Sequence, residues 1–157
     1  MGSSIKAFKI RHGYDPKWLN CAVKIYNKTD LKKSDRKKLD KAFKNSFAVV
    51  TSWKSKTLIG VGRMLSDGVM YSAIFDVVID PAFQKQGVGR KIMEALISKV
   101  PHTCIHLTST FGNESFYFKL GFYPHRTAMA LYPKQLHKSR YLDWDWKPSR
   151  RNKFSSK

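Results

Sequence analysis

The 157-residue sequence is short of cysteine, of acidic side chains and of long apolar runs. Cys21 and Cys104 are its only cysteines, too few for a disulfide framework or a zinc pattern. No run approaches the roughly 18 apolar residues of a membrane-spanning helix, and residues 1–6 lack the apolar stretch of a signal peptide. We therefore expect a cytoplasmic protein with reduced thiols and no membrane association.

The shortage of acidic residues leaves a large positive charge. Only 11 Asp and Glu stand against 30 Lys and Arg, which gives a formal net charge of +19. An apolar fraction of 42% argues against a disordered chain and suffices for one domain with its own core. The composition therefore predicts a folded, basic protein that prefers anionic partners.

Hydrophobic periodicity predicts two helices followed by a mixed sheet. Asp15-Pro16 is typical of a helix start, and a second start follows at Ser34. The later pattern predicts strands at 47–53, 57–65, 69–80, 104–108 and 127–131, and helices at 88–99 and 113–120. A strand–helix–strand unit carried on an antiparallel meander indicates an α/β (α+β) fold, with a mixed, mostly antiparallel sheet flanked by helices.

The periodicity fades after Pro133, which suggests a domain boundary. We expect residues 1–132 to form a single domain and residues 133–157 to be a basic extension. That extension contains Trp144 and Trp146, and it carries eight Lys and Arg against two Asp.

The segment from Asp80 to Lys91 carries the clearest functional signal. A strand ends there, glycines turn the chain, and a helix begins at once. Backbone N–H groups at such a helix start bind anions. A dinucleotide fingerprint would need glycine in place of Ile92, and a Walker loop would need Gly-Lys-Ser/Thr after Val88. A different phosphate loop and a plain glycine turn without a ligand remain as alternatives.

A second motif, Phe116-Tyr117-Phe118-Lys119-Leu120-Gly121-Phe122, decides between them. Together with Gln84, Gly87 and Gly89, which match the pattern Gln/Arg-x-x-Gly-x-Gly/Ala, it resembles the GNAT (Gcn5-related N-acetyltransferase) superfamily. The resemblance covers about residues 47–132, and it implies the GNAT fold, with a V-shaped splay of strands at the acetyl-CoA site. Shorter patterns, Gly60-x-x-Arg63 and Asp76-Val-Val-Ile, are similar to small arylalkylamine-type acetyltransferases.

The resemblance implies acetyl-CoA as acetyl donor and assigns residues to its binding. A bulge around Val77, Val78 and Ile79 would aim a backbone N–H at the thioester carbonyl, and its strand would pair with the pantetheine arm. The pyrophosphate would lie on the loop that follows, formed by Gln84, Lys85, Gln86, Gly87, Val88, Gly89 and Arg90. Asn113, before the second motif, is a further candidate for contact with CoA, offset from the position usual in the family.

Amide formation needs a proton for the departing thiolate and removal of one from the amine. The resemblance makes Tyr117 the general acid, against the alternative of an ordinary core tyrosine. Among the scarce carboxylates we expect Asp76 to be the base, ahead of Glu114 and Asp67, with water as the remaining alternative. No metal is expected, because no further ligands converge on the face of His102 and His106, and Cys104, between them, is expected in the core.

These features predict an N-acetyltransferase that acts on a primary amine, that of a small molecule, by direct attack in a ternary complex. A charge of +19 should repel polyamines and Lys-rich tails. Two alternatives are an acceptor carried on nucleic acid, such as a charged tRNA or a base, and a regulatory module that binds CoA without catalysis. The expected oligomeric state is a monomer or a homodimer.

Overall fold

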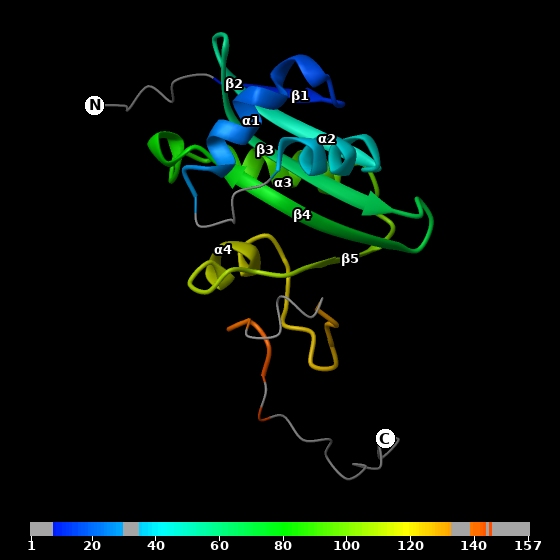
Figure 1. The fold of residues 1–157 in the computed structure, drawn as a ribbon. Helices are drawn as coiled ribbons and strands as arrows, with labels where there is room; N and C mark the ends of the chain where they lie inside the picture. Colours follow the sequence, from blue (N-terminus) through cyan, green and yellow to red (C-terminus); the bar gives the residue numbers. More distant parts are fainter. Residues whose placement is uncertain (1–7, 30–34, 133–138, 144, 146–157) are drawn as a thin grey trace, which may run out of the picture. The chain divides into compact units, whose positions relative to one another are not determined.

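The computed structural model describes residues 8–29, 35–132, 139–143 and 145. It divides the chain into two compact units, Met1–Leu120 and Gly121–Lys157, and each is described by itself. The first unit contains every helix and strand of the described residues (Figure 1). The expected boundary at residue 132 stays a prediction, because most of the extension lies outside the described residues.

A five-stranded sheet organises the first unit, in the order β1-β2-β3-β4-β5. Its strands are β1 (Lys9–His12), β2 (Ala48–Lys54), β3 (Thr57–Ser66), β4 (Tyr71–Ile79) and β5 (Cys104–Leu107). The first three pairings are antiparallel and β4 pairs with β5 in parallel, which confirms the expected mixed, mostly antiparallel sheet. Strand β1 was not predicted from the sequence.

Two helices and their caps cover one face of the sheet. Asp15 accepts a hydrogen bond from the Lys17 N–H (2.9 Å) and begins a 3₁₀ turn, Pro16–Trp18, that leads into α1 (Leu19–Tyr26). Asp35 caps α2 (Arg36–Lys44), so the cap lies one residue after the expected start at Ser34, which is outside the described residues. The buried faces of α1 and α2 form one core with β2, β3 and β4, in which Tyr26, Phe43 and Val61 are almost fully buried.

The third helix, α3 (Val88–Ile97), covers the opposite face. Val61 lies in the core with α1 and α2, whereas its neighbour Gly62 faces α3, since side chains of neighbouring strand residues point to opposite sides. The close approach of α3 depends on glycine: a Cβ added at Gly62 would lie 2.7 Å from Ile92 Cγ2 and 3.2 Å from Leu96 Cδ1. The middle of α3 thereby lies close to β3. A last short helix, α4 (Glu114–Phe118), follows β5.

Two expectations about the second half of the chain are wrong. Residues 127–131 are not a strand: they have no hydrogen-bonded neighbour strand among the described residues, and Met129 and Leu131 are 81% and 98% exposed. A short apolar run becomes a strand only where another strand can pair with it. Cys104 is exposed and not in the core, because it has the same strand parity as His106 and shares its face.

No helix among the described residues is both long enough and apolar enough to cross a membrane.

Candidate functional site

The end of β4 carries a bulge opposite Gly62. Val61 pairs with Val78 but Arg63 pairs with Phe75, so Asp76 and Val77 together face a single residue of β3. Asp76 has a φ of 54°, the left-handed conformation that few side chains adopt. The expected bulge at residues 77–79 overlaps the observed one at Val77. The observed bulge begins one residue earlier, at Asp76, and Val78 and Ile79 are in regular register with β3.

Asp76, the expected base, forms an ion pair. Arg63 Nε donates a hydrogen bond to Asp76 Oδ2 at 2.5 Å, between side chains that are 16% and 29% exposed. The Asp76 carbonyl accepts a long hydrogen bond (3.5 Å) from the hydroxyl of buried Tyr26. Both the side chain and the backbone of the bulge are thus tied to neighbouring elements.

The carboxyl-terminal half of β4 is open on its outer side. Strand β5 pairs with β4 only from Tyr71 to Ile74, and it ends at Leu107. Figure 1 shows the two strands diverging beyond this short ladder. Within the described residues no strand pairs with residues 75–79 along this edge, so the sheet splays where Val77, Val78 and Ile79 lie.

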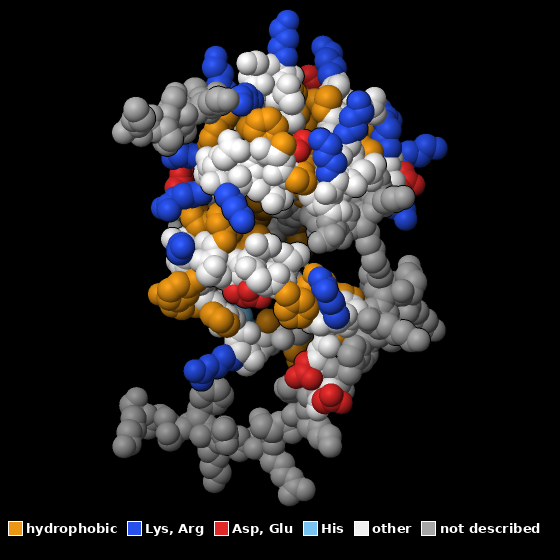
Figure 2. All heavy atoms as spheres, turned by 90° about the vertical axis from the view of Figure 1, so that its left-hand side faces the viewer, with side chains coloured by type: hydrophobic (Ala, Val, Ile, Leu, Met, Phe, Trp, Pro, Cys, Tyr) orange, Lys and Arg blue, Asp and Glu red, His pale blue; other side chains and the backbone are white. Residues whose placement is uncertain are grey.

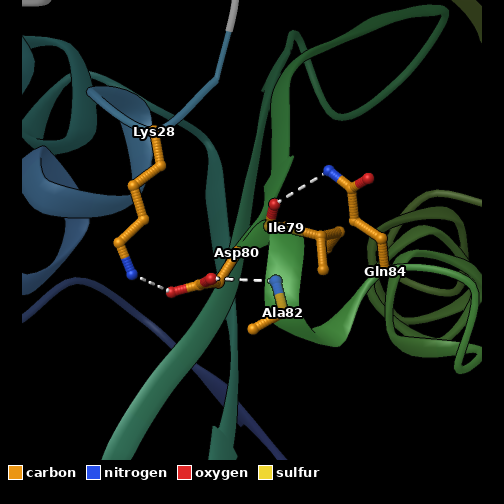
Figure 3. A network of polar contacts seen from close by, with 5 residues as sticks. All are labelled: Lys28, Ile79, Asp80, Ala82 and Gln84. Atoms are coloured by element: carbon orange, nitrogen blue, oxygen red, sulfur yellow. Dashed lines mark hydrogen bonds and ion pairs between the residues drawn. The ribbon is translucent and has the colours of Figure 1, made fainter.

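A network of polar contacts holds the turn that follows β4 (Figure 3). Asp80 accepts hydrogen bonds from the Ala82 N–H (3.1 Å) and from Lys28 Nζ (2.7 Å), which lies just beyond the end of α1. Burial raises the pKa of Asp80, but the contacts with Lys28 and Ala82 outweigh it and hold the pKa below its usual value. Gln84 donates its side-chain amide to the Ile79 carbonyl (3.3 Å), so this expected cofactor residue shapes the turn itself.

The loop then places backbone N–H groups at the start of α3. Lys85 and Gly87 both have left-handed backbone conformations, with φ of 58° and 83°. Alternation of such residues turns successive N–H groups toward one side, which forms an anion-binding concavity. The Lys91 N–H bonds to the Gly87 carbonyl, and no side chain of the described residues caps the N–H groups of Val88, Gly89 and Arg90. These three N–H groups can bind an anionic ligand.

The cationic side chains beside this loop are paired within α3. Arg90 Nε and Lys91 Nζ each lie 2.9 Å from a carboxylate oxygen of Glu94, one turn further along. Gln86 donates to the Ala82 carbonyl (3.1 Å). The loop would therefore bind an anion mainly through its backbone N–H groups. The carboxylate of Glu94 offsets the repulsion between the helix dipole and the charges of Arg90 and Lys91.

Helix α4 lies against the same helix start. A Cβ added at Gly89 would lie 3.5 Å from Phe116 Cζ and 3.7 Å from Ile79 Cγ1. Gly89 therefore lies between the end of β4 and α4. The structure thus brings the expected loop, the expected bulge strand and the Phe-Tyr motif close together. The neighbouring Tyr117 is half-buried, and burial raises its pKa. Its ring packs edge-on against Phe116, with centroids 5.0 Å apart.

The remaining candidates, Asn113 and the possible metal ligands, do not gather at one binding site in the structure. Asn113 precedes α4, but its side chain donates to Thr110 Oγ1 (2.6 Å) and does not cap the helix. His102 Nε2 lies 3.1 Å from the Gly68 carbonyl, and Cys104 Sγ lies 3.9 Å from His106 Nε2. Among the described residues no three His, Cys, Asp or Glu side chains gather as a metal site would require.

Arg63 and Lys28 are site residues to which the sequence pattern assigned no role. Arg63 stood out only as part of a short pattern, although the tight turn after Ser66 offers a signal. A hairpin register counted back from that turn places Arg63 opposite Phe75, beside Asp76. Lys28 is 52 residues from Asp80, and no local pattern connects them.

Comparison with known proteins places this geometry in a family. The model of the acetyltransferase (GNAT) domain matches residues 21–129, which is more than half of the chain. The match includes most of α1, all of the sheet except β1, the glycine loop and α4.

Two curated relatives and one solved structure illustrate the similarity. An uncharacterized N-acetyltransferase, ycf52, of Gracilaria tenuistipitata var. liui is 37% identical over 93 residues, 55% of this chain and 51% of that protein. The histone acetyltransferase TAP1 of Glycine max is 33% identical over 99 residues, 54% of this chain and 43% of that protein. The chain thus spans about half the length of these relatives.

A probable acetyltransferase of meticillin-resistant Staphylococcus aureus has the same fold. The superposition has a TM-score of 0.69 and covers 80% of this chain and 99% of that one, at 24% sequence identity. This similarity concerns the arrangement of helices and strands.

Proposed function

Because the chain belongs to the GNAT acetyltransferase family, we propose that it transfers the acetyl group of acetyl-CoA to a primary amine of a small molecule, by direct attack in a ternary complex. One observation carries the proposal. The uncapped start of α3 follows two left-handed residues and adjoins both the open edge of β4 and the helix of Tyr117. Together these elements provide an anion site, an open strand edge and a proton donor, which transfer of an acetyl group from acetyl-CoA to an amine would use.

The residues at the loop and the strand edge fit the two halves of acetyl-CoA, which supplies an activated acetyl thioester when bound. The N–H groups of Val88, Gly89 and Arg90 would donate hydrogen bonds to the pyrophosphate. The open edge at Val77, Val78 and Ile79 offers backbone groups to the amides of the pantetheine arm. A backbone N–H of the bulge would donate to the thioester carbonyl and stabilise negative charge there.

Tyr117 would supply the proton for the departing thiolate. Since burial raises its pKa, the phenol stays protonated at neutral pH. Transfer to a thiolate like that of cysteine is uphill, because the ordinary pKa values are about 10 and about 8.5. The residue must therefore act through position, and α4, packed at Gly89 through Phe116, provides that position.

Glu114 is available for the amine. It lies three residues before Tyr117, on the same face of α4. Of the carboxylates in residues 8–29 and 35–120, it is the one that makes no hydrogen bond or ion pair with the described chain. The others each bind a cation, a hydroxyl or a backbone N–H. We propose that Glu114 attracts the ammonium form of the acceptor and that water takes up its proton before the neutral amine attacks.

The charge of the chain supports a small acceptor. A relative is named a histone acetyltransferase, but a Lys-rich histone tail would meet a protein of net charge +19. A small amine carries little charge and suffers little repulsion. The enzyme would work in the cytoplasm, as a monomer or a homodimer. Its cysteines among the described residues, Cys21 and Cys104, are both free, in agreement with a reducing compartment.

The test combines acetyl-CoA binding with catalysis. Calorimetry measures the Kd of acetyl-CoA, and CoA release is followed across small amines, amino acids, Lys-rich peptides and charged tRNA. We expect turnover with a small amine, and Tyr117→Phe should lower kcat by about 10²- to 10⁴-fold with little change in Kd. Binding without CoA release for any acceptor would favour a regulatory module, and equal turnover in Tyr117→Phe would exclude Tyr117 as the acid.

A further inference from the structure

We propose that the Arg63–Asp76 ion pair holds the β4 bulge in the conformation that aims its backbone N–H at the thioester, so that Asp76 is a positioning residue and not the proton acceptor. The inference rests on the proposed function, since it concerns how the same site polarises the acetyl carbonyl. It assigns a role to Arg63 and replaces the sequence-based assignment of Asp76.

The bulge needs an external constraint because its backbone is unfavourable. Asp76 is one of three non-glycine residues with positive φ in the described chain, and the only one inside a strand. Aspartate tolerates the left-handed region better than most residues but does not prefer it. Without a contact to hold it, the extra residue could shift along β4 and rotate the N–H groups that follow.

Arg63 supplies that contact from the neighbouring strand. Its Nε binds Asp76 Oδ2 at 2.5 Å, and its guanidinium lies 5.3 Å from the centre of the Phe75 ring. The pairing of Arg63 with Phe75 in the ladder fixes the arginine directly beside the bulge. One side chain thus contacts both the residue before the bulge and its first residue.

A second contact holds the backbone of the bulge from the layer of α1. The Tyr26 hydroxyl of α1 points to the Asp76 carbonyl at 3.5 Å, and Tyr26 is 1% exposed. Asp76 is therefore fixed through its carbonyl and through its carboxylate, of which one oxygen, Oδ2, is bound by the guanidinium. This arrangement fits a structural constraint on the bulge better than proton transfer.

Substitutions separate the two roles of Asp76. Asp76→Ala and Arg63→Met should each lower kcat by about 10²-fold, the cost of losing one oxyanion donor, because both release the bulge. Asp76→Asn should recover most of that loss, since asparagine tolerates positive φ and its amide oxygen accepts from Arg63. If Asp76 is the base, Asp76→Asn is as inactive as Asp76→Ala, whereas Arg63→Met, which keeps the carboxylate, stays active. That result would overturn the inference.

Infrared spectroscopy measures the hydrogen bond from the bulge to the thioester carbonyl in the absence of an acceptor amine. Infrared difference spectra of acetyl-CoA labelled with ¹³C at the carbonyl report the hydrogen bond to the thioester as a shift to lower frequency. We expect this shift in the wild type and in Asp76→Asn, and its loss in Asp76→Ala and Arg63→Met, with the Kd of acetyl-CoA changed by less than about threefold, under a kcal/mol. A full shift in Arg63→Met would contradict the inference.

Arg11→Met is the matched control. Arg11 also places its guanidinium over an aromatic ring, 4.8 Å from the centre of Trp53, but on β1 at the far edge of the sheet. It should leave kcat and the carbonyl shift unchanged, and circular dichroism of each variant identifies loss of fold. Failure of the wild type to bind acetyl-CoA or to shift its carbonyl would count against the proposed function, whereas normal wild-type behaviour with unaffected Arg63→Met would count against the ion pair alone.

Discussion

At the scale of single residues, Gly87 and Gly89 lie on either side of the first residue of α3 but are glycine for different reasons. Gly87 has a φ of 83° and open space around its missing Cβ, so any other residue there is strained by its backbone alone. Gly89 lies inside α3 without a positive φ, and an added Cβ would make ordinary contacts of 3.5 Å and more. Its glycine is therefore not required by the fold.

We predict opposite effects of alanine at these positions. Gly87→Ala should lower the free energy of unfolding by about 1–2 kcal/mol, the cost of a left-handed side-chain residue. Gly89→Ala should raise it by about 0.5–1 kcal/mol, because alanine is favoured in a helix. The Kd of acetyl-CoA should nevertheless rise about tenfold or more in Gly89→Ala, because the methyl group prevents close approach of the phosphates.

Urea denaturation and calorimetry measure the two quantities on the same samples. A Gly89→Ala protein that is more stable and binds acetyl-CoA normally would exclude the start of α3 as the phosphate site. Parallel losses of stability and binding at Gly89 would show instead that the glycine serves packing.

At the scale of elements, the Lys28–Asp80 pair fastens the end of α1 to the turn that begins the loop. Asp80 is 7% exposed as a residue, and its N–H also bonds to the Ile59 carbonyl (2.9 Å). Because the folded pKa of Asp80 lies below its ordinary value of about 3.9, the folded protein binds fewer protons than the unfolded chain in this range. The pair therefore stabilises the fold above about pH 4, and this contribution is lost as pH falls through the folded pKa.

Asp80→Asn should accordingly lower Tm by a few degrees at pH 7, for a loss of about 1–2 kcal/mol, since Lys28 is half exposed. The difference from the wild type should shrink below about pH 4. Thermal melts from about pH 2.5 to 7 measure this difference in Tm across the ordinary Asp pKa. A difference that grows in acid would contradict the expected direction of the pH dependence.

Asp40→Asn, which removes an ion pair on α2, is the control. It should leave acetyl-CoA binding unchanged, whereas Asp80→Asn should weaken acetyl-CoA binding.

The elements whose periodicity is local were predictable from the sequence. The helix beginning at Val88, the hairpin strands around Gly60 and Tyr71, and the loop between Gln84 and Gly89 all lie where the pattern placed them. Strand β1 escaped because four residues, three of them exposed, carry no alternation. The prediction of a strand at 127–131 is wrong for a different reason, since this short apolar run has no pairing partner among the described strands.

The candidate site likewise contains residues that the sequence could identify and residues that it could not. Residues that belong to a motif, such as Tyr117 and the loop glycines, could be identified as candidates from the sequence. Their roles in catalysis and binding stay predictions. The position of the bulge and the partner of Asp76 depend on the β3–β4 register, which one residue of slippage changes. Such contacts are set by tertiary packing, so the family resemblance placed the bulge one residue late and local spacing left Arg63 without a role.

At the scale of the whole molecule, the net charge of +19 results from 30 Lys and Arg against 11 Asp and Glu. Figure 2 shows Lys and Arg side chains over much of the face in view, with few carboxylates among them. Glu94 neutralises part of the charge near the loop, and Asp40 pairs with Lys44 on α2. The other lysines of α2, Lys37, Lys38 and Lys41, are exposed. They form the densest cluster of positive charge in the described helices.

We predict that this cluster, and not a specific site, governs binding to nucleic acid, the alternative partner that the charge suggests. Binding of uncharged tRNA should be measurable at low salt and should weaken steeply as salt rises, because lysine–phosphate contacts release counterions. Replacing Lys37, Lys38 and Lys41 by Gln should reduce the slope of log K against log salt by about 2–3, since each phosphate that a lysine neutralises contributes about 0.7–0.9.

A second triple variant tests whether the position of the charge matters. Substitution of Lys9, Lys56 and Lys99 by Gln removes the same charge from other exposed positions and should change the slope less. Equal slopes for the two triple variants would show that the charge acts only as a diffuse field, and no binding at low salt would remove nucleic acid as a partner. Acceleration of CoA release by charged tRNA alone, with no small amine accepted, would instead transfer the acceptor assignment from small molecules to tRNA.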